Sequence, residues 1–247
     1  MISNISAIVR SLLFMLVVTV WTVLVCSLVL LCFWLPHHVL RQMGHIWTTP
    51  VTWLIRYLLG ISYELRGAEN IVHPAVILSK HQSAWETIVL QEIFPDLLFV
   101  WKKELKYLPF FGWALALMPM ISIDRGAGKN ALNQLVTQGK RRLSQDYSVA
   151  VFPEGTRVAP GFKRRYKIGG AFLAVDAGVP LIPVALNSGE VWGRNALLKR
   201  PGRVVVSIGP RIDTVGISPE EANARAEQWI ENEMRRISPA LYPDEAA

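Results

Sequence analysis

The stretch from Ser11 to Leu40 contains no Asp, Glu, Lys or Arg, and it limits what the chain can fold into more than any other feature. Within it, Leu12 to Leu35 exceeds the roughly 20 apolar residues that cross the core of a bilayer. A cleaved signal peptide is the alternative, but its apolar region would hold about 7 to 15 residues before a small-residue cleavage site. Because neither feature is evident, the sequence predicts a membrane-embedded apolar helix over residues 11–35.

A second apolar stretch runs from Ile46 to Ile61 and is too short to span a bilayer comfortably. It contains the cation Arg56 together with three aromatic residues, Trp47, Trp53 and Tyr57. Helices that lie in the headgroup region combine such aromatics with a snorkelling cation. We therefore expect an interfacial or re-entrant helix over residues 46–61, with a helix packed on the soluble domain as the alternative. Residues 1–61 would form the membrane anchor.

The charges near the anchor indicate how it is oriented. No acidic residue occurs before Glu64, whereas Arg10, Arg41 and Arg56 do. Basic residues after an apolar segment favour the cytoplasmic side, so we expect an inner-membrane protein with its catalytic domain facing the cytoplasm. Charge does not decide whether the first helix crosses the membrane or forms a hairpin with the second in one leaflet.

The chain carries a net charge of +7, with basic clusters at 140–142, 163–165 and 199–200. No segment resembles a nucleic-acid-binding module, and an anchored basic protein is expected to meet lipid headgroups rather than nucleic acid. The two cysteines, Cys26 and Cys32, both lie in the apolar segment and have the spacing of neither a disulfide framework nor a metal site. Membrane lipids are thus the expected partners, and no metal site is predicted.

Beyond the anchor, residues 62–247 alternate short apolar strands with helical segments, which is typical of one α/β domain. The hydrophobic content of 51% suffices for one sizeable core. We expect a mainly parallel or mixed sheet flanked by helices, with active residues on loops at strand ends. The predicted strands are 75–79, 97–101, 120–123, 149–152, 181–186 and 204–208. The predicted helices are 87–94, 129–144 and 168–177, and a last helix opens with a capping box at Ser218 and stops near Pro239.

A histidine and a carboxylate follow the first of these strands, in the segment Lys80-His81-Gln82-Ser83-Ala84-Trp85-Glu86-Thr87. Residues at i and i+5 lie roughly 140° apart on a helix, so His81 and Glu86 meet only if His81 precedes the helix that carries Glu86. A carboxylate that accepts the Nδ1 hydrogen bond leaves Nε2 free to remove a proton. The spacing suits a general base with its orienting acid. A surface histidine beside a solvated glutamate is the alternative.

Further blocks follow in order: Lys102-Lys103-Glu104-Leu105, Ile123-Asp124-Arg125, Phe152-Pro153-Glu154-Gly155-Thr156-Arg157 and Val179-Pro180-Leu181-Ile182-Pro183-Val184. With these blocks, the chain from about Tyr63 to about Ile208 resembles the lysophosphatidate acyltransferase family. Members usually carry Asp where this chain has Glu86, and often Gly where it has Pro119. The longer glutamate still reaches the imidazole, and Pro119 bears on a local turn.

The resemblance implies that the acceptor is lysophosphatidate and assigns the residues that bind its phosphate and glycerol. Arg157 would supply a bidentate fork and Lys103 a point charge, with Arg125 and Lys167 as further basic groups. The turn made by Glu154, Gly155 and Thr156 would present backbone and side chains to the acceptor. Glu154 would hold Arg157 or bind the glycerol. For Arg157, a structural salt bridge with Glu154 is the alternative.

The implied reaction moves a fatty acyl group from a thioester, acyl-CoA or acyl carrier protein, to the sn-2 hydroxyl of 1-acyl-sn-glycerol 3-phosphate. The product is phosphatidic acid, and neither a metal nor an organic cofactor is expected. Ser83 lacks the Gly-x-Ser-x-Gly setting of a nucleophile. An apolar tunnel for the acyl chain would use residues 109–113, Leu115, Leu117 and Met118, unless these are core or membrane-facing. Another lysophospholipid or glycerol 3-phosphate as acceptor, and a non-enzymatic lipid-binding protein, remain alternatives.

Overall fold

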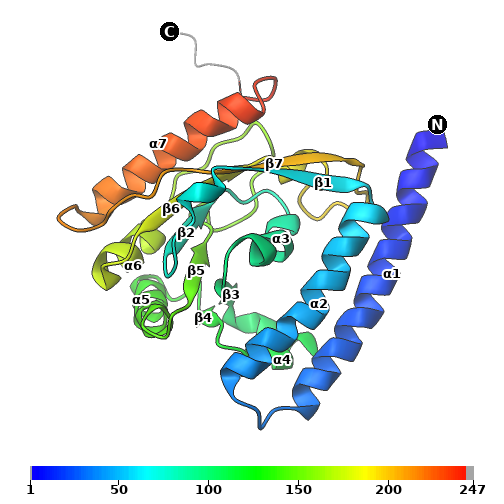
Figure 1. Cartoon of the computed structure of the whole chain (residues 1–247), viewed down its shortest axis with the longest axis horizontal. Coiled ribbons are helices and arrows are strands. Elements are labelled where there is room, and N and C mark those ends of the chain that lie inside the picture. The colour runs from blue at the N-terminus through cyan, green and yellow to red at the C-terminus, as the bar shows by residue number, and fades with distance from the viewer. Residues whose placement is uncertain (1, 243–247) are drawn as a thin grey trace.

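Short apolar strands pair into one seven-stranded sheet that has helices on both faces (Figure 1). The structure is a computed structural model, and it describes residues 2–242. Its strands are β1 (Ile61–Arg66), β2 (Val76–Ser79), β3 (Leu97–Lys102), β4 (Ile121–Ile123), β5 (Ser148–Val151), β6 (Leu181–Leu186) and β7 (Gly202–Ile208). Its helices are α1 (Ile2–Leu31), α2 (His37–Tyr57), α3 (Trp85–Ile93), α4 (Phe111–Leu117), α5 (Lys129–Leu143), α6 (Gly169–Ala177) and α7 (Pro219–Ile237).

The strand order is β1-β7-β6-β2-β5-β3-β4. Every neighbouring pair is parallel except β6 and β7, which run antiparallel with Val184 opposite Ile208. The predicted mainly parallel or mixed sheet is therefore confirmed. Because β2 to β6 all run in one direction, their carboxyl ends meet at one edge of the sheet, and the loops that follow them lie together.

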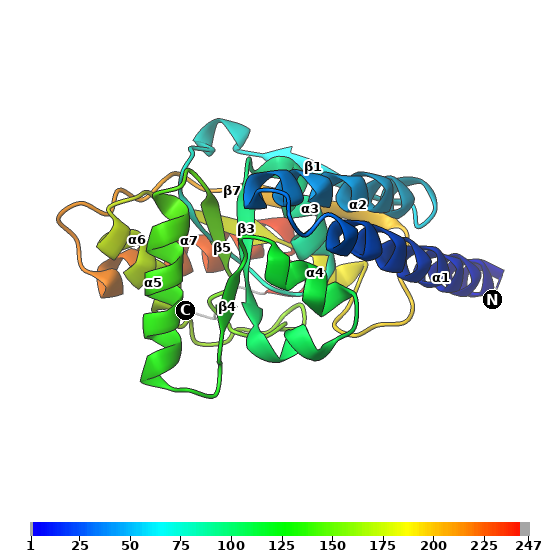
Figure 2. The ribbon, with the colours of Figure 1, turned by 90° about the horizontal axis from the view of Figure 1, so that it is seen from below.

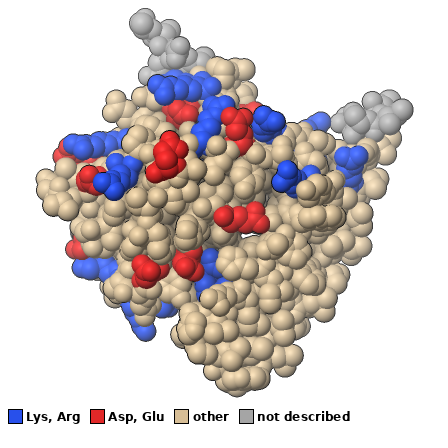
Figure 3. Space-filling model, viewed as in Figure 1, with Lys and Arg blue, Asp and Glu red and all other residues tan. Residues whose placement is uncertain are grey.

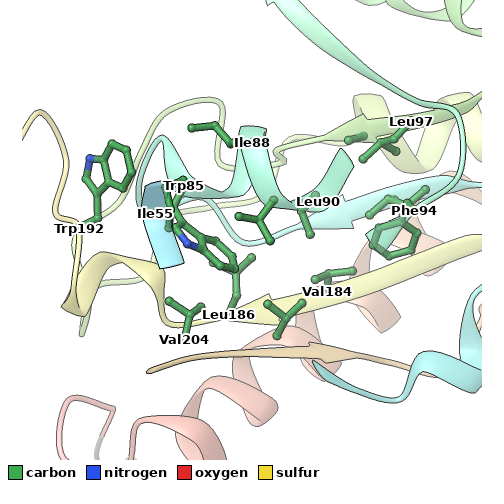
Figure 4. Close-up of a cluster of buried hydrophobic side chains, with 14 of the residues drawn as sticks. Ile55, Trp85, Ile88, Leu90, Phe94, Leu97, Val184, Leu186, Trp192 and Val204 are labelled. Carbon is green, nitrogen blue, oxygen red and sulfur yellow. The ribbon is translucent and has the colours of Figure 1, made fainter. Parts of the chain in front are cut away.

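Successive residues of the central strands face opposite layers, as the pleat requires. Ile77 and Val184 pack into a core with α3 and α2, and Val76 and Ala185 pack into a second core with α5, α6 and α7. Figure 4 shows the first core, in which the side chain of Trp85 lies between Ile55 of α2 and the strands. Both faces of the sheet are thus buried, which explains the nearly continuous apolar runs of β2, β5 and β6.

Helices α1 and α2 form an antiparallel hairpin along one side of the domain (Figures 1 and 2). α2 begins at His37 and ends at Tyr57, so the predicted bounds of 46–61 are wrong at both ends, and Pro50 lies inside the helix. Val51 and Ile55 are buried in the domain core, whereas Trp53 and Tyr57 are mostly exposed. One face of α2 therefore packs on the domain, as the alternative predicts, and the opposite face is exposed.

α1 begins at Ile2, before the predicted start at residue 11, and ends at Leu31, before the predicted end at residue 35. Among the described residues, Ile5–Leu31 is one segment long and apolar enough to cross a bilayer. Near its start the helix contacts the domain, because Phe14 packs edge-on against Trp192 and the Ser11 hydroxyl accepts from the Lys199 amide. Figure 3 shows that the end of the hairpin opposite the N-terminus is free of charged side chains in that view.

The remaining elements agree with the sequence pattern to within a few residues, with two omissions. Ser218 is the N-cap of α7, as the capping-box pattern predicts, since its hydroxyl accepts from the Glu221 amide at 3.1 Å. No strand was expected at β1, an edge strand of mainly exposed residues that pairs with β7, and no helix at α4. Partner strands and packing, rather than local periodicity, select these two elements.

Candidate active site

His81 lies in the loop between β2 and α3, at the sheet edge where the carboxyl ends of β3, β4 and β5 also lie. Its ring stacks on Phe152, with centroids 3.8 Å apart and planes 14° from parallel. Its backbone is held on both sides: its amide donates to Glu154 Oε2 at 2.8 Å, and its carbonyl accepts from the Val158 amide at 2.8 Å. The imidazole is thus fixed in place with 13% of the side chain exposed.

The carboxylate of Glu86 is fully buried at the first turn of α3. Oε1 accepts from the Gln82 amide at 2.6 Å and from the Ser188 hydroxyl at 2.9 Å, and Oε2 accepts from the Ser83 amide at 3.0 Å. Oε2 lies 3.9 Å from His81 Nδ1, which is beyond hydrogen-bond range. The predicted direct hydrogen bond is therefore absent, because the loop amides and Ser188 hold the carboxylate.

Within the described residues, His81 Nδ1 is buried and has no hydrogen-bond partner, and the Glu86 carboxyl group lies 3.9 Å from it. Burial, followed by the charges of Arg157 and Arg125, lowers the pKa of His81 to about 3. Burial also raises the pKa of Glu86, against the hydrogen bonds that it accepts from Gln82 and Ser83. The imidazole is therefore neutral at neutral pH and able to accept a proton.

A cavity of about 600 Å³ opens beside His81 and has two chemically different ends. Its polar end is lined by Thr156, Arg157, Arg125, Arg194 and Asn195. Its apolar end reaches the hairpin and α4, where it is lined by Val25, Cys26, Val29, Trp47, Ala114, Leu115 and Met118. His81 thus lies between guanidinium groups and an apolar channel. Of the predicted tunnel residues, Phe111, Leu115 and Met118 line this cavity, whereas Trp113 is 49% exposed.

The predicted phosphate-binding residues fall into two groups. Arg157 and Arg125 line the cavity: Arg157 Nη1 donates to Asn195 Oδ1 at 3.3 Å, and Arg125 Nη1 donates to the Gly155 carbonyl at 3.0 Å. Lys103 instead pairs with Asp124, and the neighbouring Lys102 lines the cavity. Two guanidinium groups beside a histidine form a setting for a phosphate.

Gly155 adopts a φ of +69°, a backbone conformation that a side chain would strain. A Cβ there would lie 2.9 Å from Lys167 Nζ, so the group that approaches this glycine is the Lys167 side chain. The Lys167 side chain therefore packs against Gly155, and neither residue is among those that line the cavity. The role of Lys167 as a further basic group for the acceptor stays a prediction.

Glu154 is fully buried, and its partners are Lys80 and the His81 amide. Its Oε1 lies 2.9 Å from Lys80 Nζ, and its Oε2 accepts from the His81 amide. Neither predicted role for Glu154, holding Arg157 or binding the glycerol, fits this geometry, and the alternative salt bridge with Arg157 is not formed. Burial raises the pKa of Glu154 to about 7, against the opposing effect of Lys80.

Sequence reasoning missed several residues of the site. Lys80 directly follows the fully buried strand β2, and a lysine in that position signals a buried partner. Ser188 and Asn195 had no such signal, since they reach the site only through the fold. Within residues 2–242, no group of three or more His, Cys, Asp or Glu side chains is arranged to hold a metal ion.

Comparison with known proteins is consistent with this geometry. The family model described as acyltransferase matches residues 62–187. The 1-acyl-sn-glycerol-3-phosphate acyltransferase of Pseudomonas aeruginosa is 48% identical over 197 residues, which cover 78% of this chain and 77% of that protein. The human 1-acyl-sn-glycerol-3-phosphate acyltransferase alpha is 33% identical over 178 residues, 70% of this chain and 63% of the human protein.

A solved structure shares the fold. The 1-acyl-sn-glycerophosphate acyltransferase PlsC from Thermotoga maritima superposes with a TM-score of 0.79 at 22% identity, and the match covers 95% of this chain and 97% of that chain. The family match, the identity to the Pseudomonas protein and the site together show that this chain belongs to the acyltransferase family.

Proposed function

We propose that the protein transfers a fatty acyl group from an acyl thioester to the sn-2 hydroxyl of 1-acyl-sn-glycerol 3-phosphate, which gives phosphatidic acid for phospholipid biosynthesis. The observation that carries this proposal is the position of His81 in the cavity, between the guanidinium groups of Arg157 and Arg125 and the apolar channel. A lysophosphatidate molecule has the same order of groups: a phosphate, a hydroxyl and an acyl chain.

In this reaction His81 Nε2 takes the proton of the acceptor hydroxyl while its oxygen attacks the thioester carbonyl. The new C–O bond forms, the C–S bond breaks, and the imidazolium returns the proton to the leaving thiolate. Glu86, 3.9 Å from Nδ1, stabilises the imidazolium that forms. Atoms and charge balance with the two substrates alone, so the proposed reaction uses no metal or organic cofactor, with acyl-CoA or acyl carrier protein as donor.

Phosphate binding would also affect the base. Burial lowers the pKa of His81, and the charges of Arg157 and Arg125 lower it further. A bound phosphate would offset the part of the shift that comes from the two arginines, so the pKa of the imidazole would rise when the acceptor binds. A site that activates its base only when the acceptor phosphate is present would discriminate against lysolipids with other headgroups.

The hairpin indicates how the enzyme meets its lipid substrates. α1 contacts Trp192 and Lys199 near its start and α4 further along, so the domain holds the helix over much of its length. A helix held in this way fits a hairpin that enters one leaflet better than a helix that leaves the domain to cross the membrane. The basic residues of the anchor favour a catalytic domain on the cytoplasmic side. Because the apolar channel ends at the hairpin, acyl chains can enter from the bilayer without crossing water.

The test follows phosphatidate formation from lysophosphatidate and an acyl thioester by detergent-purified protein. His81→Ala should reduce the rate by at least about 100-fold, because general-base assistance is worth roughly 10²- to 10⁴-fold. His38→Ala, at an exposed position of α2, is the matched control and should keep the parent rate. Equal rates for the parent and His81→Ala would contradict the mechanism. Faster acylation of lysophosphatidylcholine or glycerol 3-phosphate would contradict the acceptor.

A further inference from the structure

Two carboxylates from distant parts of the chain converge on the buried ammonium group of Lys80. Lys80 Nζ lies 2.9 Å from Glu154 Oε1 and 2.8 Å from Glu231 Oε1 on α7, and the Tyr166 hydroxyl donates to Glu231 Oε1 at 2.9 Å. Lys80 and Glu154 are fully buried, and Glu231 is 6% exposed. Burial lowers the pKa of Lys80, but the two carboxylates outweigh burial and raise the pKa above its usual value, so the ammonium stays charged.

This network continues directly to the base. Glu154 binds Lys80 with one oxygen and accepts the His81 amide hydrogen bond with the other. Lys80 itself immediately precedes His81, and its amide donates to the Val184 carbonyl of β6 at 2.9 Å. A chain of polar contacts therefore runs from α7 through Glu231, Lys80 and Glu154 to the backbone of the residue that would carry the chemistry.

Stability alone does not account for such a cluster. Burying charges is costly, and a well-packed apolar group can often replace a buried ion pair without loss of stability. An apolar group at position 231 would leave Lys80 with one carboxylate, Glu154, whose other oxygen positions the His81 amide. These polar contacts therefore hold the loop of His81 in one position. Such a role matters for catalysis, because an error of about 1 Å in the position of a catalytic group costs about 100-fold in rate.

α7 offers a contrasting carboxylate two residues away. Glu233 is also buried, 8% exposed, and accepts from the Ser207 hydroxyl of β7 at 2.8 Å. Its other contact among the described residues is with Arg236 on the same helix, so it connects α7 to β7 and not to the loop of His81. Glu231 and Glu233 thus provide a pair of buried glutamates on one helix with different connections.

We propose that Glu231 is a positioning residue for the acyl transfer: through Lys80 and Glu154 it fixes the backbone of His81. The proposal rests on the proposed function of His81 as the base, and it extends the catalytic apparatus beyond residues 62–187, the part that the family model matches, to the C-terminal helix. Tyr166 supports Glu231 within the same network.

The kinetic test compares Glu231→Gln with Glu233→Gln in the full-length protein. Glu231→Gln should lower kcat for phosphatidate formation at least about tenfold and leave the KM for lysophosphatidate within about twofold, because a displaced base affects the transition state more than acceptor binding. Glu233→Gln should keep kcat near that of the parent. Equal losses of kcat in the two variants, or a change confined to KM, would overturn the proposal.

Amide hydrogen exchange gives a readout that needs no substrate. In Glu231→Gln the His81 amide should exchange at least about tenfold faster than in the parent or in Glu233→Gln, because its acceptor Glu154 is no longer held from the α7 side. Unchanged exchange would refute the positioning role. If the parent forms no phosphatidate, the proposed function fails, and exchange at His81 still decides this inference. Should Glu231→Gln fold poorly, Tyr166→Phe should show the same changes with smaller size.

Discussion

Replacing Ser188 with Ala should slow acyl transfer without disturbing the cavity. The Ser188 hydroxyl is fully buried and donates to Glu86 Oε1 at 2.9 Å, although the two residues lie 102 positions apart in the sequence. A hydrogen bond to a charged group contributes about 1.5 to 3 kcal/mol. If Ser188→Ala removes this energy from the transition state, in which Glu86 stabilises the imidazolium, kcat falls by roughly 10- to 150-fold.

Ser207→Ala is the matched control, since this buried serine donates to Glu233 Oε1 at 2.8 Å on the far side of the sheet. Each variant should lose about 1.5 to 3 kcal/mol of unfolding free energy. At about 2 to 4 °C per kcal/mol for a chain of this size, both thermal midpoints should drop by about 3 to 12 °C.

Initial rates of phosphatidate formation, measured well below both thermal midpoints, separate the two effects. Ser188→Ala should be slow and Ser207→Ala near the parent rate. The reasoning is refuted if Ser188→Ala retains the parent rate within about twofold, or if Ser207→Ala slows the reaction equally, since the loss would then follow stability and not the state of Glu86.

Three further predictions concern the cavity and the backbone. Arg157→Ala should raise the KM for lysophosphatidate about 10- to 100-fold. Because the charge of Arg157 lowers the pKa of His81, its removal should also move the acid limb of the pH profile of kcat/KM to higher pH. An unmoved acid limb would contradict the effect of Arg157 on the pKa of His81. Ala114→Phe should shift donor preference toward shorter acyl chains in competition assays with mixed thioesters, since Ala114 lines the apolar end of the cavity; an unchanged preference would place the chain elsewhere. In chemical denaturation, Gly67→Ala should lower the free energy of unfolding far more than Gly178→Ala. Both glycines have positive φ, so the backbone strain of an alanine, about 1 to 2 kcal/mol, is common to the two variants. At Gly67 a Cβ would also lie 2.1 Å from a carbonyl oxygen, whereas at Gly178 no atom lies within 4 Å of it. Equal losses would contradict the steric argument.

Local patterns in the chain predicted most of the architecture. The six expected strands and four expected soluble-domain helices all form, because apolar runs, helical periodicity, capping residues and turn glycines are properties of neighbouring residues. β1 and α4 escaped prediction, since β1 is held by β7 from the far end of the chain and α4 by packing on α1.

The sequence predicted which loops form the site, but it did not predict which atoms contact one another. His81, Arg125 and Arg157 share one cavity, as expected from strands that end at one edge. The role of Glu154 was predicted wrongly, because its partner Lys80 was not recognised as buried and charged.

The sequence by itself determined that this chain carries an apolar anchor, an α/β domain and a histidine at the end of a buried strand. The tertiary structure decided what each polar group contacts: Ser188 reaches Glu86 from 102 positions away, and Glu231 reaches Lys80 from 151 positions away. The physical reason is that periodicity reports which face of an element is buried. Partners across the sheet depend on strand order, and strand order is settled only when all the elements pack together.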